Sequence, residues 1–91
     1  MTGQEMKDIH EAAEVRSGEV CELFSIALTT LYRWYIGEAK PKQMMMHDRA
    51  VKITEMIGKA TEAGFLPVKD VVGKQRLVQI KIALRKVVDI G

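Results

Sequence analysis

The chain has 91 residues, 47% hydrophobic and 29% charged, which is enough for one domain with a modest core and too little for two. Its net charge of +2 is small, no apolar run approaches the roughly 20 residues that span a bilayer, and the start lacks a signal-peptide stretch. The single cysteine, Cys21, excludes an internal disulfide and favours a reducing compartment, so we expect a cytoplasmic protein.

The first two predicted helices are short. Thr2 and Glu5 have the spacing of a capping box, which predicts a helix over 3–14. Ser17 is a suitable N-cap for a second helix, because its hydroxyl can accept a free amide of the first turn. Cys21 falls on the inward side of that helix, where we expect it to pack as a small hydrophobic residue.

Residues 25–27 (Ser-Ile-Ala) interrupt the helical period and predict a turn, with Ile26 directed inward. A third helix is predicted over 28–36, because Gly37 ends it and Pro41 prevents its continuation.

The longest helical pattern covers 42–63, and Gly64 supplies a left-handed end. Its apolar stripe is predicted to consist of Met46, Ala50, Ile53, Ile57 and Ala60. The run Met44–Met46 fits core and helix-start packing, with a partner-binding surface as the alternative.

Residues 65–73 predict a loop, and residues 74–90 are ambiguous. The segment VQIKIAL alternates as a strand does, but the composition favours a helix. On a helix, Leu77, Ile80, Leu84 and Val87 form one apolar stripe. This stripe can complete the core, pair with a second copy or contact a different protein. We therefore expect one domain over 1–64 and an extension over 65–91 for dimerisation or core completion.

The third helix has two different sides at 100° per residue. Leu31, Trp34 and Tyr35 fall on one side, which suits the core. The other side consists of Leu28, Thr29, Tyr32, Arg33 and Ile36. It has no acid, although residues 1–39 carry seven acidic and only three basic residues. Arg can bond guanine and Thr can bond base or phosphate, so this side suits a DNA major groove.

Charge also favours a polyanionic partner, because residues 40–91 carry eleven basic against five acidic side chains. Solvated helix faces would explain the same asymmetry.

Two short helices joined by a tight turn, the second of which contains TTLYRW with a glycine three residues after Trp34, resemble the Cro/lambda-repressor type of helix-turn-helix regulator. The likeness extends to Pro41, a little under half of the chain. It implies an all-α, compact bundle of about five helices that binds a palindromic operator as a homodimer. Three positions differ from the usual family pattern: Ser17, Ser25 and Ala27, where the family often has Gln, Gly and a capping Ser or Thr.

The resemblance also assigns roles to individual residues. Matches to base-reading positions are Leu28, Thr29, Tyr32 and Arg33. Ser17 and Thr30 match positions that touch phosphate, and Lys40 and Lys42 follow in the loop beyond. Buried scaffold positions are matched by Phe24, Ile26, Leu31 and Trp34.

Other chemistry finds little support in the sequence. His10 and His47 have no further ligand at metal-binding spacing, so we expect no metal and no cofactor. No nucleophile arrangement or phosphate-binding glycine loop is present, so we expect no enzyme activity.

The sequence therefore predicts a transcriptional regulator that binds double-stranded DNA, most simply a phage or mobile-element repressor. The alternatives are an antitoxin or excision-type accessory DNA binder, and a small helical protein that binds and inhibits a host protein.

Overall fold

The computed structural model describes residues 1–38 and 44–90, and within them every regular element is an α-helix. The predicted all-α fold class is confirmed, and the ambiguous tail is helical. The five helices are α1 (Gly3–Ala12), α2 (Ser17–Phe24), α3 (Leu28–Tyr35), α4 (Met44–Glu62) and α5 (Lys74–Ile90).

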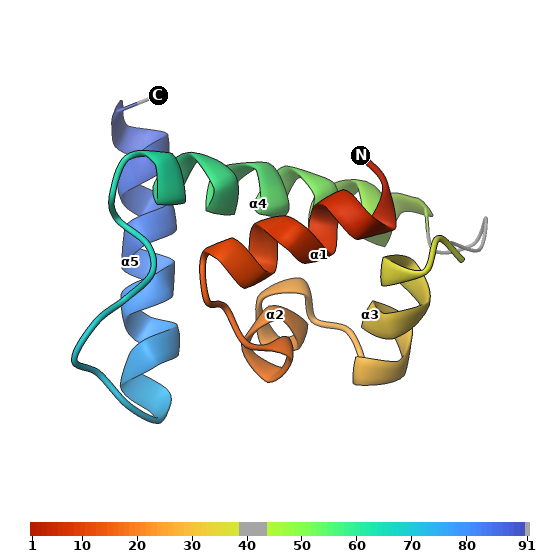
Figure 1. The fold of residues 1–91 in the computed structure, drawn as a ribbon, viewed down its shortest axis with the longest axis horizontal. Helices are drawn as coiled ribbons and strands as arrows, with labels where there is room; N and C mark the ends of the chain where they lie inside the picture. Colours follow the sequence, from red (N-terminus) through yellow and green to blue (C-terminus); the bar gives the residue numbers. More distant parts are fainter. Residues whose placement is uncertain (39–43, 91) are drawn as a thin grey trace.

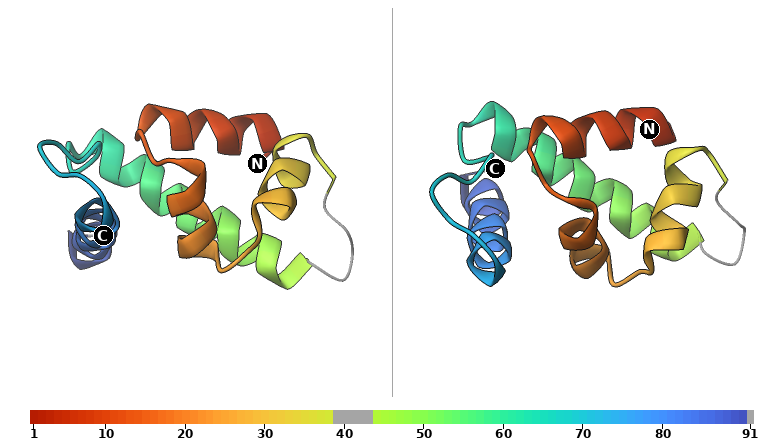
Figure 2. Two further views of the ribbon diagram at one scale, coloured as in Figure 1. Left: turned by 90° about the horizontal axis from the view of Figure 1, so that it is seen from below. Right: turned by 60° about the horizontal axis from the view of Figure 1, so that its bottom comes forward.

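The helices pack in two layers with a helix across one end (Figures 1 and 2). α1 lies along the long α4, and the short α2 and α3 pack beneath this pair. α5 packs against the far end of α4, so α3 and α5 lie at opposite ends of the molecule (Figure 1). The molecule measures 37 × 28 × 19 Å.

One hydrophobic core connects the first 64 residues with the C-terminal segment. Ile80, Leu84 and Val87 on α5 are 0%, 7% and 6% exposed and join the same buried cluster as α1 to α4. This corrects the assignment of these three residues to a dimer contact, because side chains buried within one chain offer no surface to a second copy. Leu77, the fourth member of the stripe, is half-buried. The extension therefore completes the core, which is one of the roles left open by the sequence.

The helix ends follow the local chemistry with one exception. The capping box is confirmed, since the Thr2 hydroxyl accepts the Glu5 amide and the Glu5 carboxylate accepts the Thr2 amide, both at 3.1 Å. Gly64 has the expected left-handed backbone, with φ of 83°. Ser17, however, is the first residue of α2 and not its N-cap, which is Arg16.

The start of α4 differs from the prediction. Met44, Met45 and Met46 are 44%, 88% and 45% exposed, so Met46 does not belong to the buried stripe. Ala50, Ile57 and Ala60 are buried as expected, and Ile53 is half-buried. The three methionines therefore lie on the surface of the described part of the chain.

Candidate nucleic-acid interface

The turn between α2 and α3 is three residues long and depends on the backbone of Ser25. Ser25 is left-handed, with φ of 57° and ψ of 48°, a conformation that glycine adopts at less cost. The Cys21 carbonyl accepts the amides of both Ser25 and Ile26, which satisfies the end of α2. Ile26 then packs partly buried against the core, so the chain turns into α3 at a fixed point.

The two sides of α3 lie as the sequence predicted. Leu31 and Trp34 are 0% and 1% exposed, and Tyr35 is half-buried. The outer side is accessible: Leu28, Thr29, Tyr32, Arg33 and Ile36 are all exposed. The eight residues of α3 contain no acid, so this outer side presents one cation, hydroxyls and apolar groups.

α3 is fixed in place by very close backbone packing against α1. A Cβ atom built on Gly3 would collide with the backbone carbonyl oxygens of Trp34 and Tyr35. The first turn of α1 can therefore approach the last turn of α3 only because residue 3 is glycine. On its other flank, the Trp34 ring meets the His47 ring of α4 edge-on, with centroids 5.2 Å apart.

His10 connects α1, on which it lies, with α3 and α4. Its Nδ1 lies 2.6 Å from the Tyr35 hydroxyl on α3, and its Nε2 lies 2.9 Å from the Thr54 hydroxyl on α4. The ring is 1% exposed, and this burial lowers the pKa of His10 to about 4. The imidazole is therefore neutral at pH 7, and donates through one nitrogen while it accepts through the other.

The sequence indicates the buried position of His10 through helical periodicity, which a search for metal-ligand spacing does not consider. Met6, His10 and Ala13 recur at helical spacing and all are buried, so His10 belongs to the inward stripe of α1. Its hydroxyl partners could not be identified in advance, because Thr54 lies 44 residues away.

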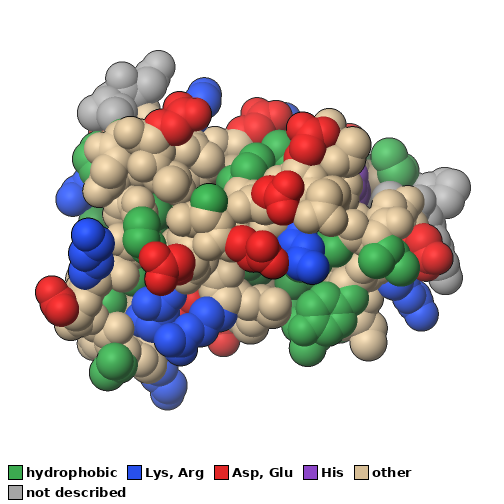
Figure 3. All heavy atoms as spheres, viewed as in Figure 1, with side chains coloured by type: hydrophobic (Ala, Val, Ile, Leu, Met, Phe, Trp, Pro, Cys, Tyr) green, Lys and Arg blue, Asp and Glu red, His purple; other side chains and the backbone are tan. Residues whose placement is uncertain are grey.

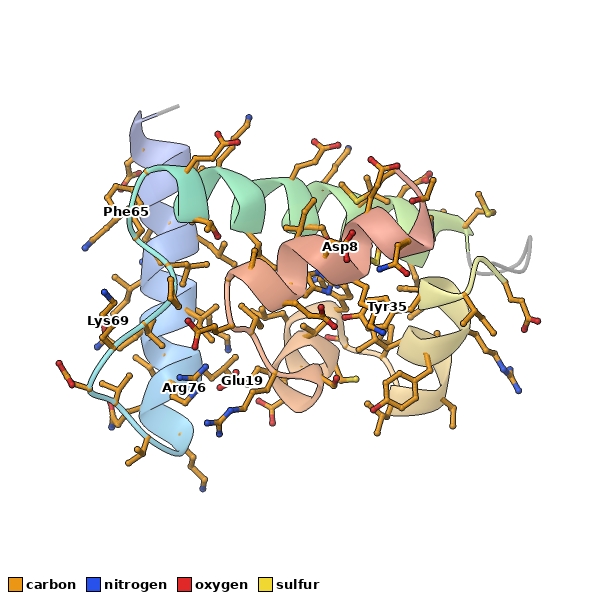
Figure 4. The ribbon with its side chains drawn as sticks, in the orientation of Figure 1. Asp8, Glu19, Tyr35, Phe65, Lys69 and Arg76 are labelled. Carbon is orange, nitrogen blue, oxygen red and sulfur yellow. The ribbon has the colours of Figure 1, made fainter. Side chains whose placement is uncertain are left out.

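An ion pair ties α5 to the start of α2 (Figure 4). The Arg76 Nε donates to Glu19 Oε2 at 3.1 Å, and its Nη2 donates to the Glu14 carbonyl at 2.7 Å. Glu19 Oε1 also accepts the Arg16 amide at 2.9 Å, so one carboxylate caps α2 and holds α5. No local pattern indicated this pair, whose members are 57 residues apart.

Of the predicted phosphate contacts, the two described ones are less accessible than the predicted base contacts. Ser17 and Thr30 are half-buried, in the first turns of α2 and α3 respectively. Lys40 and Lys42 lie in 39–43, outside the described residues.

Among the described residues, no three His, Cys, Asp or Glu side chains gather in a way that could hold a metal ion. Within the same part of the chain, no helix combines the length and apolarity that a membrane crossing needs. Comparisons with protein-family models, with curated proteins and with solved structures found no match.

Proposed function

We propose that this protein is a regulator of transcription that binds double-stranded DNA in a sequence-specific way, with α2 and α3 as a helix-turn-helix. The observation that carries the proposal is the outer side of α3. A short helix that follows a three-residue turn exposes Leu28, Thr29, Tyr32 and Arg33 and presents no acid. Such a helix can enter a major groove, where Arg33 would bond guanine and the apolar groups would meet thymine methyls.

Rigid anchoring of α3 also supports this proposal. Base readout requires side chains to reach the groove in one register, and a helix that shifts would not discriminate between bases. Trp34 and Leu31 in the core, the backbone contact at Gly3 and the His10–Tyr35 hydrogen bond all restrain α3.

In this proposal, the protein binds a palindromic operator as a homodimer. It represses transcription by occupying a promoter. One α3 helix offers few base contacts, and two helices spaced about 34 Å apart would read successive major-groove faces.

Selection of bound fragments from random duplex DNA tests the proposal with the full chain. We expect a two-fold symmetric consensus and an affinity that falls steeply from low to moderate salt. Failure to enrich any sequence, at low salt and with folded protein, would contradict the proposal.

Arg33→Ala should weaken binding to the selected sequence by about 1–3 kcal/mol, because a bidentate contact to one guanine per half-site is lost. The selected consensus should relax at that position only. Arg85→Ala is the matched control, since Arg85 is exposed on α5, at the end of the molecule opposite α3. An unchanged consensus for Arg33→Ala would exclude this register of α3.

One observation favours a second candidate function, the inhibition of a protein by direct binding. Leu28, Tyr32 and Ile36 are spaced one helical turn apart and are 44%, 50% and 74% exposed. Such an apolar row also fits a groove on a protein. A partner bound in this way would lose little affinity at moderate salt, which distinguishes it from DNA.

A further inference from the structure

We propose that the outer surface of α5, with the groove between α5 and α2, is a docking site for an acidic amphipathic helix of a protein partner. The α5 part of this site lies at the other end of the molecule from the outer side of α3 (Figure 1). Its α2 wall, formed by Arg16 and Gly18, flanks Ser17, which the DNA-binding proposal assigns to a phosphate contact. The inner side of α5 is buried in the core, and the outer side contains both apolar and basic residues.

The apolar part of the site is continuous along α5. A groove of about 700 Å³ separates α2 from α5, with Leu77 and Val78 on the α5 side and Gly18 on the α2 side. A smaller hollow of about 250 Å³ continues past Val78 to Ile82. Val78 and Ile82 are 48% and 42% exposed and lie one turn apart, which is the spacing that a helical partner would contact.

The charges around this apolar row are mostly positive. Lys74, Lys81 and Arg85 lie on α5 beside the row, and Arg16 lines the groove from the α2 side. Glu19 is neutralised by Arg76, which leaves Glu22 as the opposing carboxylate among the groove residues. Figure 3 shows a group of Lys and Arg side chains toward the α5 end of the molecule, with a few Asp and Glu side chains beside them and more across the middle of the molecule.

This combination selects one kind of occupant. An acidic partner is attracted by Lys74, Lys81 and Arg85, and its apolar residues would cover Val78 and Ile82. A DNA backbone would satisfy the cations but would leave the apolar row without a partner. A second copy of α5 would oppose the same cations across the contact, which is unfavourable.

Selection of about 20-residue peptides from a random displayed library, on the folded full chain, tests the proposal. We expect the enriched peptides to carry apolar residues at helical spacing with Asp and Glu beside them. A synthetic copy of an enriched peptide then measures affinity by fluorescence polarisation.

Two substitutions block the site by different means. Gly18→Trp places an indole at the groove, at a position where a Cβ atom meets nothing within 4 Å. Ile82→Asp adds a charge to the apolar row. Each should lower the affinity for the peptide by about tenfold or more, equivalent to about 1.4 kcal/mol. Circular dichroism should show an unchanged fold.

A charge reversal with a matched control tests the electrostatic part. Lys81→Glu should lower the affinity for the acidic peptide by about tenfold. Lys52→Glu, the same change on the exposed surface of α4, should have little effect on that affinity. The proposal is wrong if the library yields no helical acidic pattern, or if Gly18→Trp and Ile82→Asp both bind the peptide normally. It is also wrong if the full chain self-associates through this surface, or if duplex DNA displaces the peptide and Lys81→Glu abolishes DNA binding.

Discussion

At the scale of single residues, Gly3 is a position where the local helix preference and the tertiary contact oppose each other. Alanine is the better helix former, but a Cβ atom here would meet the carbonyl groups that end α3. Gly18 provides the comparison, because its Cβ would project into open space.

We predict that Gly3→Ala lowers the free energy of unfolding by about 1–3 kcal/mol, because α1 and α3 must separate to admit the methyl group. Gly18→Ala should leave it unchanged or raise it by up to about 1 kcal/mol. Urea unfolding of both variants measures the difference. Equal effects of the two substitutions would mean that α1 and α3 do not meet this closely.

His10 gives the fold a dependence on pH. Its pKa is lowered to about 4 by burial, whereas an unfolded histidine titrates near 6.5. As pH falls below 6.5, the unfolded chain gains a proton that the folded chain excludes, so stability decreases until the pH reaches the folded pKa.

We therefore predict a loss of about 2 kcal/mol between pH 7 and pH 5, as measured by chemical denaturation. His10→Gln should be less stable at pH 7 but should lose much less over this interval. The pKa of Glu5 is lowered, mainly by the Thr2 backbone hydrogen bond. The stability that its carboxylate provides is therefore lost only at lower pH, as the carboxylate protonates. If the wild-type and His10→Gln chains show equal pH slopes, His10 is not buried as a neutral group.

At the scale of elements, Arg76 links α5 to the segment that leads into α2. Its guanidinium donates to a side chain and to a backbone carbonyl in a largely buried setting, where both the Glu19 and Arg76 side chains are at most 15% exposed. Removal of one member leaves the other with an unpaired charge.

Arg76→Met should lower the free energy of unfolding by about 1–3 kcal/mol. Arg85→Met, on the exposed side of the same helix, should change it by less than about 0.5 kcal/mol. A double-mutant cycle with Glu19→Gln should show coupling between positions 19 and 76. Additive effects in that cycle would show that the pair contributes nothing to stability.

At the scale of the whole molecule, α5 belongs to the one core. Buried residues of α5 include Ile80, Ala83, Leu84 and Val87, which pack with residues of the first 64 positions. Each buried aliphatic side chain contributes about 1.5–3 kcal/mol, against a total stability of about 5–15 kcal/mol for a domain.

A chain that ends at Gly73 should therefore lose cooperative thermal unfolding and much of its helical circular dichroism. The substitution Val88→Ser, at a residue of α5 that is 61% exposed, is the control and should unfold as the wild type does. Cooperative unfolding of the shortened chain near the wild-type temperature would instead make residues 1–73 an independent domain.

The sequence by itself determined the features that depend on neighbouring residues. Periodicity, end signals and, for residues 74–90, composition located the helices of the described residues to within a few residues. The capping box at Thr2 and Glu5 needed only its own turn. The outer side of α3 followed from 100° per residue and from the apolar character of Leu31 and Trp34.

Only the tertiary structure decided which apolar stripe meets which neighbour. Periodicity finds the stripe of α5 but cannot distinguish a partner in the same chain from one in a second copy, and α4 proves to cover it. The contacts of Gly3, His10 and Arg76 join positions 25 to 62 residues apart, so no local pattern contains them. Local rules determine the conformation of each segment, whereas burial and long-range hydrogen bonds depend on how the segments meet in space.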